Sequence, residues 1–251
     1  MIPIKNEMEI ESMRAAGLAA RSVLERLAGM VRPGITTLEI DQAAADYMAE
    51  QKCRSAFLGY RGFPGQVCIS INEEVVHGIG GPRRLQLGDI VKLDVGVNKG
   101  GWIGDTATTV AVGQVSATAV RLMEVTKQAL AVALQHAVSG RRLGDLCAAI
   151  EQTVVQNSFS VVREFVGHGV GKKLHEEPQV PNFGRPGDGP KLKPGMTLAI
   201  EPMVNVGRAG VKVLRDNWTV VTEDGGLSAH FEHTVLITKG EPEILTCVGS
   251  I

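Results

Sequence analysis

Asp94 and Asp105 stand on either side of a turn, in a segment whose pattern predicts a β-hairpin. Residues 90–97 form an apolar run typical of a buried strand, residues 98–101 are Asn, Lys, Gly and Gly, and residues 102–112 fit the returning strand. With the turn centred between its two middle residues, the aspartates face each other directly, with Cβ atoms about 5 Å apart.

Two carboxylates at this separation repel each other, so the folded hairpin needs something that offsets the repulsion. A shared proton, a basic partner or a metal ion would each do so. The alternative is a pair of solvated surface aspartates, which are common. A one-residue slip in the strand register would also place the two side chains on opposite faces.

Three further segments place metal-type ligands in strand contexts. His168 lies among glycines, Glu201 ends an apolar strand, and Glu232 lies inside another. A lone buried histidine is commonly a hydrogen-bonded core residue, but unpaired buried carboxylates are rare because desolvating them is costly. Together with Asp94 and Asp105 they form an oxygen-rich set with one nitrogen. Such a set favours two hard or borderline divalent ions, such as Mn, Fe or Co, over a thiolate zinc site.

The elements that would position these residues are helices and antiparallel strands. Paired capping signals at Asn6 and Glu9, and at Thr36 and Glu39, predict two helices near the start of the chain. Further helices are predicted over 118–138 and 143–156, strands over 67–71, 161–166, 197–206, 218–222 and 230–238, and a surface loop over 181–194. The pattern indicates an α+β protein with helices packed on a strongly curved antiparallel sheet, as a single domain over 1–251.

The bulk composition is that of an ordinary globular protein of 251 residues, with 44% hydrophobic and 21% charged residues. A net charge of −1 gives no electrostatic reason to expect nucleic acid or a membrane as partner. The four cysteines are scattered, and the chain has neither a signal peptide nor an apolar run of about 20 residues. We therefore expect a reduced, soluble, cytoplasmic protein.

Seven stretches, in this order and spacing, resemble the type I methionine aminopeptidases over nearly the full chain: 68–78, 92–96, 104–109, 167–171, 175–178, 200–202 and 231–233. The resemblance implies the pita-bread fold with its pseudo-twofold halves. It also implies removal of the initiator methionine from nascent chains whose second residue is small. A monomer in transient contact with the ribosome is expected, and the lack of an N-terminal extension suggests a bacterial source.

The resemblance also implies roles for the candidate ligands. Asp105, His168 and Glu201 would hold one divalent ion (Co, Mn, Fe or Zn), and Asp94 would hold a second, with Asp105 and Glu232 bridging both. Glu201 would accept the proton of the attacking water and pass it to the leaving amine.

The implied substrate contacts lie outside the metal ligands. His175 would stabilise the oxyanion and His77 would hydrogen-bond the scissile amide. The expected methionine pocket has an aromatic and sulfur-tolerant lining: Phe57, Tyr60, Phe63, Cys68 and Trp218. Plain core packing is the alternative for Phe57 and Phe63. Four positions at the border of the pocket differ from the residues that are common in the family: Phe57, Arg61, Phe63 and Leu174. The resemblance therefore does not fix the shape of the pocket.

The family also has a monovalent cation site, for Na or K, formed largely by backbone carbonyls. Asn72, Glu74 and Ser228 match its positions. We therefore expect such an ion here as well.

Three alternatives fit the sequence less well. A proline-specific aminopeptidase or prolidase would carry a large N-terminal domain, and only about ninety residues precede Asp94. A type II methionine aminopeptidase would need an insertion for which the later segments leave no room. A catalytically silent binding protein on the same fold would typically lose ligands, whereas all five are present.

Overall fold

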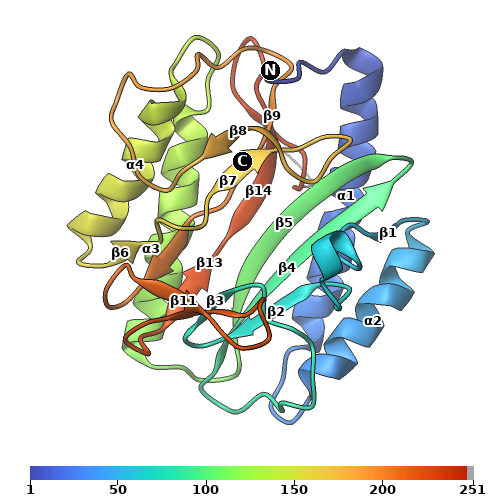
Figure 1. The fold of residues 1–251 in the computed structure, drawn as a ribbon, viewed down its shortest axis with the longest axis vertical. Helices are drawn as coiled ribbons and strands as arrows, with labels where there is room; N and C mark the ends of the chain where they lie inside the picture. Colours follow the sequence, from blue (N-terminus) through green and yellow to red (C-terminus); the bar gives the residue numbers. More distant parts are fainter. Residues whose placement is uncertain (248–251) are drawn as a thin grey trace.

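The structure is a computed structural model that describes residues 1–247. Four long helices flank an antiparallel sheet: α1 (Glu7–Met30), α2 (Thr37–Glu50), α3 (Ala117–His136) and α4 (Leu143–Gln156). A short 3-10 turn covers Tyr60–Gly62. In Figure 1, α1 and α2 lie beside β4 and β5, while α3 and α4 lie on the far side of β14. The predicted α+β class is confirmed.

The first two helices begin where the capping signals predict. The Asn6 side chain accepts a hydrogen bond from the Glu9 amide at 3.1 Å, and the Glu9 carboxylate accepts one from the Asn6 amide at 3.1 Å. Thr36 and Glu39 repeat this reciprocal pair at the start of α2. These bonds satisfy amides that have no partner within the helix, which is why a local sequence pattern fixes the helix start.

The main sheet has nine strands. Seven follow the order β1-β4-β5-β14-β9-β7-β8, with β2 also on β4 and β15 also on β14. Their bounds are β1 (Arg54–Ser55), β2 (Cys68–Ile71), β4 (Ile90–Lys99), β5 (Trp102–Ala111), β7 (Gly167–Gly169), β8 (Glu176–Val180), β9 (Thr197–Ile200), β14 (Glu232–Leu236) and β15 (Glu243–Ile244).

Two three-stranded sheets complete the fold. One is β13 (Ser228–His230), β10 (Met203–Asn205) and β6 (Ser160–Val161); the other is β11 (Val211–Val213), β12 (Val220–Thr222) and β3 (Glu74–Val76). The predicted strands over 197–206 and 230–238 are therefore each two strands that change sheet. Pro202, which has no amide hydrogen, interrupts the first, and Phe231 interrupts the second directly opposite it, with its amide 3.4 Å from the Pro202 oxygen. The predicted strand over 161–166 ends at Val161.

The two faces of β4 have different neighbours. Val91, Leu93, Val95 and Val97 are buried in one core with α1 and α2. A second core joins α3 and α4 to the strands of the later half. Because side chains alternate along a strand, the even-numbered residues of β4 point to the opposite, concave face. Asp94 is one of them.

Gly104 on β5 allows the close approach of α1. A Cβ atom added there would lie 2.3 Å from the Ala16 carbonyl oxygen, which is a backbone atom that cannot move aside. We expect Gly104→Ala to destabilise the fold by about 1–3 kcal/mol. The measurement is a denaturant titration. Gly29→Ala, at a site with nothing within 4 Å, is the control and should be neutral or slightly stabilising. A neutral Gly104→Ala would contradict this packing.

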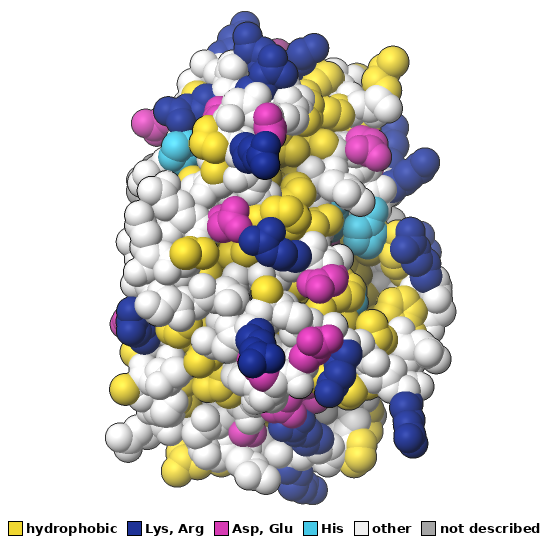
Figure 2. Space-filling view, turned by 60° about the vertical axis from the view of Figure 1, so that its left-hand side comes forward, with side chains coloured by type: hydrophobic (Ala, Val, Ile, Leu, Met, Phe, Trp, Pro, Cys, Tyr) yellow, Lys and Arg dark blue, Asp and Glu magenta, His cyan; other side chains and the backbone are white. Residues whose placement is uncertain are grey.

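The surface carries charges of both signs. On the face in Figure 2, lysine and arginine side chains lie among aspartates and glutamates, without one continuous basic surface. Within residues 1–247, every helix is too short or too polar to cross a bilayer.

Candidate metal centre

The hairpin register differs from the prediction. Lys99 pairs with Trp102, so the turn consists of Gly100 and Gly101, and Asp94 lies opposite Ala107. Both turn glycines have positive φ, 60° and 88°, as a two-residue hairpin turn that follows the strand twist requires. The predicted turn centre was one residue too early.

The error preserves the face on which the aspartates lie. It shifts the pairing by two positions, so Asp105 faces Gly96 and sits diagonal to Asp94. A shift of two keeps both side chains on one side of the sheet. The Phe57 ring packs directly over Gly96, the residue opposite Asp105, where an added Cβ atom would lie 2.3 Å from Phe57 Cε1.

The neighbouring strands bring the other ligands to the same face. Glu232 on β14 also pairs with Ala107, so Asp94 and Glu232 flank that alanine in one row across three strands. His168 on β7 pairs with Ala199 on β9, and Glu201 follows two residues later on the same side. All five predicted ligands therefore converge on the concave face.

The candidate ligand atoms lie close together. Asp94, Asp105 and Glu232 each offer an oxygen within 4.8 Å of the others. The Nε2 atom of His168 lies 3.5 Å from Glu201 Oε1 and 3.8 Å from Asp105 Oδ2. One oxygen on each of Asp94, Asp105 and Glu232 is buried without a hydrogen-bond partner.

Burial makes the charged forms of these carboxylates costly. It raises the pKa of Asp94 from 3.8 to about 7. Burial, reinforced by the other carboxylates, raises the pKa values of Asp105, Glu201 and Glu232 well above their ordinary range. Carboxylates held together in this way need a compensating positive charge to ionise at neutral pH.

His168 is oriented as a metal ligand would be. Its Nδ1 lies 2.8 Å from the Gly169 carbonyl oxygen, which can only accept, so Nδ1 carries the proton. Nε2 then presents its lone pair to Asp105 and Glu201. Burial, together with the neighbouring His175, lowers the pKa of His168 to about 3, so the ring is neutral. The orphaned oxygens and this lone pair fit divalent cations.

A cavity of about 270 Å³ opens above these ligands. The predicted pocket residues Phe57, Tyr60, Phe63, Cys68 and Trp218 all line it, as do His77 and His175. Phe63 packs edge-on against Phe57 and Trp218, with ring centroids 6.5 and 5.1 Å away. The cavity thus has a carboxylate floor and an aromatic wall.

His77 and His175 both line the cavity and contact different aromatic neighbours. His77 packs edge-on against Phe165 and Trp218, with its backbone at φ 60°. Burial lowers its pKa to about 4, so it is neutral near pH 7. The His175 ring packs against His168 with centroids 4.3 Å apart and planes tilted by 53°, and its Nδ1 lies 2.8 Å from the Tyr60 hydroxyl.

Some lining residues were not predicted. Phe165 and Met203 line the cavity. His230 lies behind the lining, with 1% of its surface exposed, and its Nε2 is 3.8 Å from Glu201 Oε2. Both ring nitrogens of His230 lack a hydrogen-bond partner. His230 lies two residues before Glu232, so its position beside the ligand segment was the available signal.

The expected monovalent cation site does not fit this structure. The carbonyl oxygens of Asn72 and Ser228 both accept hydrogen bonds from Lys92 Nζ, at 2.7 and 3.0 Å. The Glu74 carboxylate accepts from the Ile71 amide and from Arg83. Burial lowers the pKa of Lys92 to about 7, although Glu74 acts to raise it. A lysine amine lies where the ion was expected.

Comparison with known proteins decides the family. Residues 11–239 match the sequence model of Peptidase_M24, metallopeptidase family M24. The chain belongs to metallopeptidase family M24. This is a family of metal-dependent peptidases, and the carboxylate floor of the cavity agrees with that description.

Full-length relatives within this M24 family carry a more specific name. The chain is 50% identical over 248 residues to methionine aminopeptidase of Clostridium perfringens, covering 99% of this chain and 100% of that protein. It is equally identical, with the same coverage, to methionine aminopeptidase 1 of Bacillus subtilis. The Escherichia coli methionine aminopeptidase is 46% identical, covering 98% of this chain and 94% of the relative.

Solved structures confirm the pita-bread fold of this M24 chain. Methionine aminopeptidase from Thermotoga maritima aligns with a TM-score of 0.97 and 44% identity, covering 99% of this chain and 100% of that one. Prolidase from Pyrococcus furiosus aligns with a TM-score of 0.81 and 22% identity, covering 98% of this chain and 66% of that one. At such low identity the likeness to prolidase concerns the fold alone.

Proposed function

We propose that this M24 peptidase removes the initiator methionine from proteins and peptides whose second residue is small. The observation that carries the proposal is a buried carboxylate cluster forming the floor of an apolar, aromatic cavity. The cluster supplies the hydrolytic centre, and the cavity above it is of a size and polarity suited to a thioether side chain. The full-length similarity to methionine aminopeptidases supports the same substrate.

Two divalent ions, of Co, Mn, Fe or Zn, would be held by the five converging residues. Asp105, His168 and Glu201 would hold one, and Asp94 the other, with Asp105 and Glu232 shared. Bound ions would supply a nucleophilic water at neutral pH and a positive charge that polarises the scissile carbonyl. Four carboxylates match two divalent charges, which removes the cost of ionising them in a buried site.

The remaining chemistry is assigned to the protein's own groups. A Glu201 carboxylate oxygen accepts a proton from the attacking water and returns it to the nitrogen of the leaving amine. His175, whose Nδ1 is paired with the Tyr60 hydroxyl, directs Nε2 toward the carbonyl oxygen and stabilises the developing negative charge. His77 is neutral near pH 7 and hydrogen-bonds the scissile amide.

The apolar wall accounts for the choice of methionine. Phe57, Phe63 and Trp218 surround the cavity with ring edges and faces, against which sulfur packs favourably. Cys68 pairs with Asp94 in the sheet, and its polarisable sulfur is part of the lining at the base of the cavity. The free α-amine of the substrate would be bound at the Asp94 side of the metal-loaded floor, which would restrict cleavage to the first peptide bond.

A panel of peptides tests this assignment. The metal-loaded protein should release methionine from Met-Ala-Ser and should not cleave N-acetyl-Met-Ala-Ser, whose amine is blocked. Leu-Ala-Ser should be cleaved at least about tenfold more slowly, because a branched side chain fits the cavity less well. Hydrolysis of Ala-Pro peptides in preference to Met-Ala-Ser would contradict the proposal and favour a prolidase-like activity.

We further infer that residues 1–247 act as one catalytic domain in the cytoplasm, on nascent chains in transient contact with the ribosome. The nine-stranded sheet joins the two halves through β5 and β14, which supports a single domain.

A further inference from the structure

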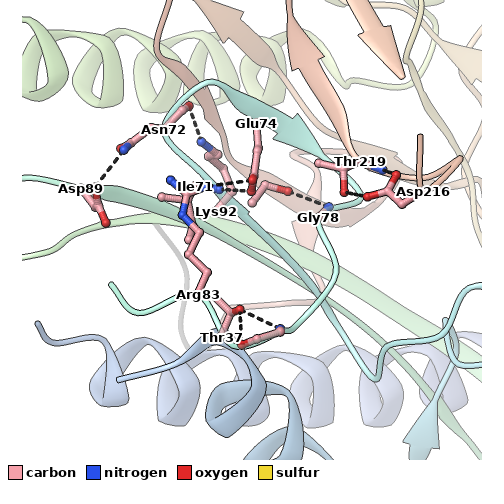
Figure 3. Close-up of polar contacts among 12 residues, drawn as sticks. Thr37, Ile71, Asn72, Glu74, Gly78, Arg83, Asp89, Lys92, Asp216 and Thr219 are labelled. Atoms are coloured by element: carbon pink, nitrogen blue, oxygen red, sulfur yellow. Dashed lines mark hydrogen bonds and ion pairs between the residues drawn. The ribbon is translucent and has the colours of Figure 1, made fainter. Parts of the chain in front are cut away.

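Lys92 is the largest of the fully buried side chains, with 1% of its surface exposed. It lies on β4 two residues before Asp94, so its side chain shares the concave face of the sheet. Its Nζ atom donates to the Asn72 carbonyl oxygen at 2.7 Å and to the Ser228 carbonyl oxygen at 3.0 Å. Figure 3 shows the first of these contacts.

The first acceptor is held rigidly. Asn72 has a left-handed backbone, with φ 52°. Its side chain donates to Asp89 at 2.8 Å (Figure 3). The same side chain accepts from the Ile90 amide at 3.0 Å. The Asn72 amide in turn donates to the Ile90 carbonyl at 3.0 Å. The turn after β2 is therefore fastened to the start of β4, and its carbonyl is aimed at Lys92.

The second acceptor belongs to the other half of the molecule. Ser228 begins β13, and its amide donates to the same Asn72 oxygen at 3.0 Å, while its hydroxyl donates to Val204 at 3.2 Å. The Lys92 amine thus completes a three-way junction between β4, the turn after β2 and β13. The next residues along β4 and β13 lead to Asp94 and Glu232, two of the proposed ligands.

The surroundings also provide negative charge. The Glu74 carboxylate is the neighbour that most favours the charged form of Lys92, and it is fixed by the Ile71 amide at 2.7 Å (Figure 3). Carbonyl oxygens with a nearby carboxylate form an environment suited to a monovalent cation. In either protonation state of Lys92, Nζ fills the space between the two carbonyls.

We propose that the Lys92 amine takes the place of an alkali metal ion as a built-in clamp between the two halves, so that this protein requires neither Na⁺ nor K⁺. An alkali ion held by carbonyls stabilises a fold by RT ln(1 + c/Kd), where c is the concentration of the ion, so its contribution depends on how far c exceeds Kd. A tethered amine is always present at the site. The proposal concerns stability, and its test does not depend on the proposed peptidase activity.

The first experiment uses the unaltered protein. Its Tm is measured by calorimetry in NaCl, KCl and choline chloride at one ionic strength, with the divalent metal present throughout. The three values should agree within about 1 °C. A saturable rise of Tm with Na⁺ or K⁺ that choline does not reproduce would overturn the proposal.

The second experiment removes the amine. Lys92→Ser opens space between the carbonyls, and we expect its Tm in choline chloride to fall by about 5–10 °C. Na⁺ or K⁺ should recover part of this loss saturably, with broadening of the ²³Na resonance that the unaltered protein does not cause. Lys92→Met fills the same space without a donor, so its lower Tm should not respond to the cation.

Lys239→Ser, at an exposed lysine, is the matched control and should leave Tm unchanged in all three salts. A folded Lys92→Ser protein with the Tm of the unaltered protein, or with no response to Na⁺ and K⁺, would overturn the proposal. If Lys92→Ser does not fold in any salt, the comparison of salts on the unaltered protein still decides.

Discussion

Asp105→Asn should abolish turnover and at the same time stabilise the metal-free protein. Asp105 lies within reach of Asp94, Glu232 and His168. It is one of the two carboxylates that we propose both ions share. We expect kcat/KM to fall by about 10³-fold or more, since metal catalysis supplies several kcal/mol of transition-state stabilisation. Tm of the metal-free protein should rise, because the amide removes a buried charge from a repelling cluster at nearly constant volume.

The measurement pairs peptide kinetics with calorimetry on metal-stripped protein. Asp46→Asn, on the exposed side of α2, is the control and should change neither quantity. Asp105→Asn with more than a tenth of the original turnover would contradict the assignment of the bridging ligand. A lower Tm of its metal-free form would show that Asp105 has a structural rather than a ligand role.

The second large effect is the pH dependence of the metal-free protein. Burial raises the pKa of Asp94 to about 7 and those of Asp105, Glu201 and Glu232 well above their ordinary values. The native state therefore binds more protons than the unfolded state, and the contribution of these groups to stability falls as pH rises. The loss of folding stability caused by these groups is absent below the ordinary carboxylate pKa, and it grows as the pH rises through neutrality.

Other buried groups change the folding stability with pH in the opposite direction. Burial lowers the pKa values of His77 and His168 to about 4 and 3, so between those values and 6.5 the unfolded state binds more protons and stability rises with pH. Above pH 7 these histidines no longer contribute. Lys92, with its pKa lowered to about 7, still opposes the carboxylates there, but it is one group against several.

We therefore expect the free energy of unfolding of the metal-free protein to fall by roughly 2 kcal/mol or more between pH 7 and 9. The metal-loaded protein should change much less, because bound cations keep the carboxylates ionised. Denaturant titrations at several pH values, with and without metal, measure the difference. Parallel pH profiles for the two forms would rule out these carboxylates as its source, and Asp105→Asn should show a shallower slope.

The helices could be predicted because their signals are local. The Asn6–Glu9 and Thr36–Glu39 pairs mark helix starts through bonds within four residues, and α4 begins and ends at the predicted residues, Leu143 and Gln156. Short strands such as β11 were missed, because three residues carry too little periodicity. The sheet changes at Pro202 and Phe231 depend on pairing between distant segments.

The site was predicted as a set of residues, but its geometry was not. The candidate ligands can be singled out in the sequence because carboxylates inside apolar strands are costly to bury. Their convergence depends on the register of β4, β5, β14 and β9, which long-range pairing decides. The hairpin turn lies at Gly100 and Gly101, one residue later than predicted, because these two glycines take the positive φ values that the turn needs.

Lys92 shows a different limit. In the sequence it is a lysine between apolar residues of a strand, a pattern that does not by itself indicate full burial. Its acceptors, Asn72 and Ser228, are backbone groups, which carry no residue-type signal, and Ser228 is 136 positions away. Only the folded arrangement reveals that an amine lies between two carbonyl groups that were expected to hold an alkali ion.

The central claim is that the buried carboxylate centre must hold divalent metal to remove N-terminal methionine. Its most direct test is the rate of methionine release from Met-Ala-Ser by metal-stripped protein, titrated with Co²⁺ or Mn²⁺ under anaerobic conditions. We predict negligible release from the stripped protein and a rise of at least about 100-fold on adding metal. Stripped protein that releases methionine at the rate of the metal-loaded protein would contradict the claim.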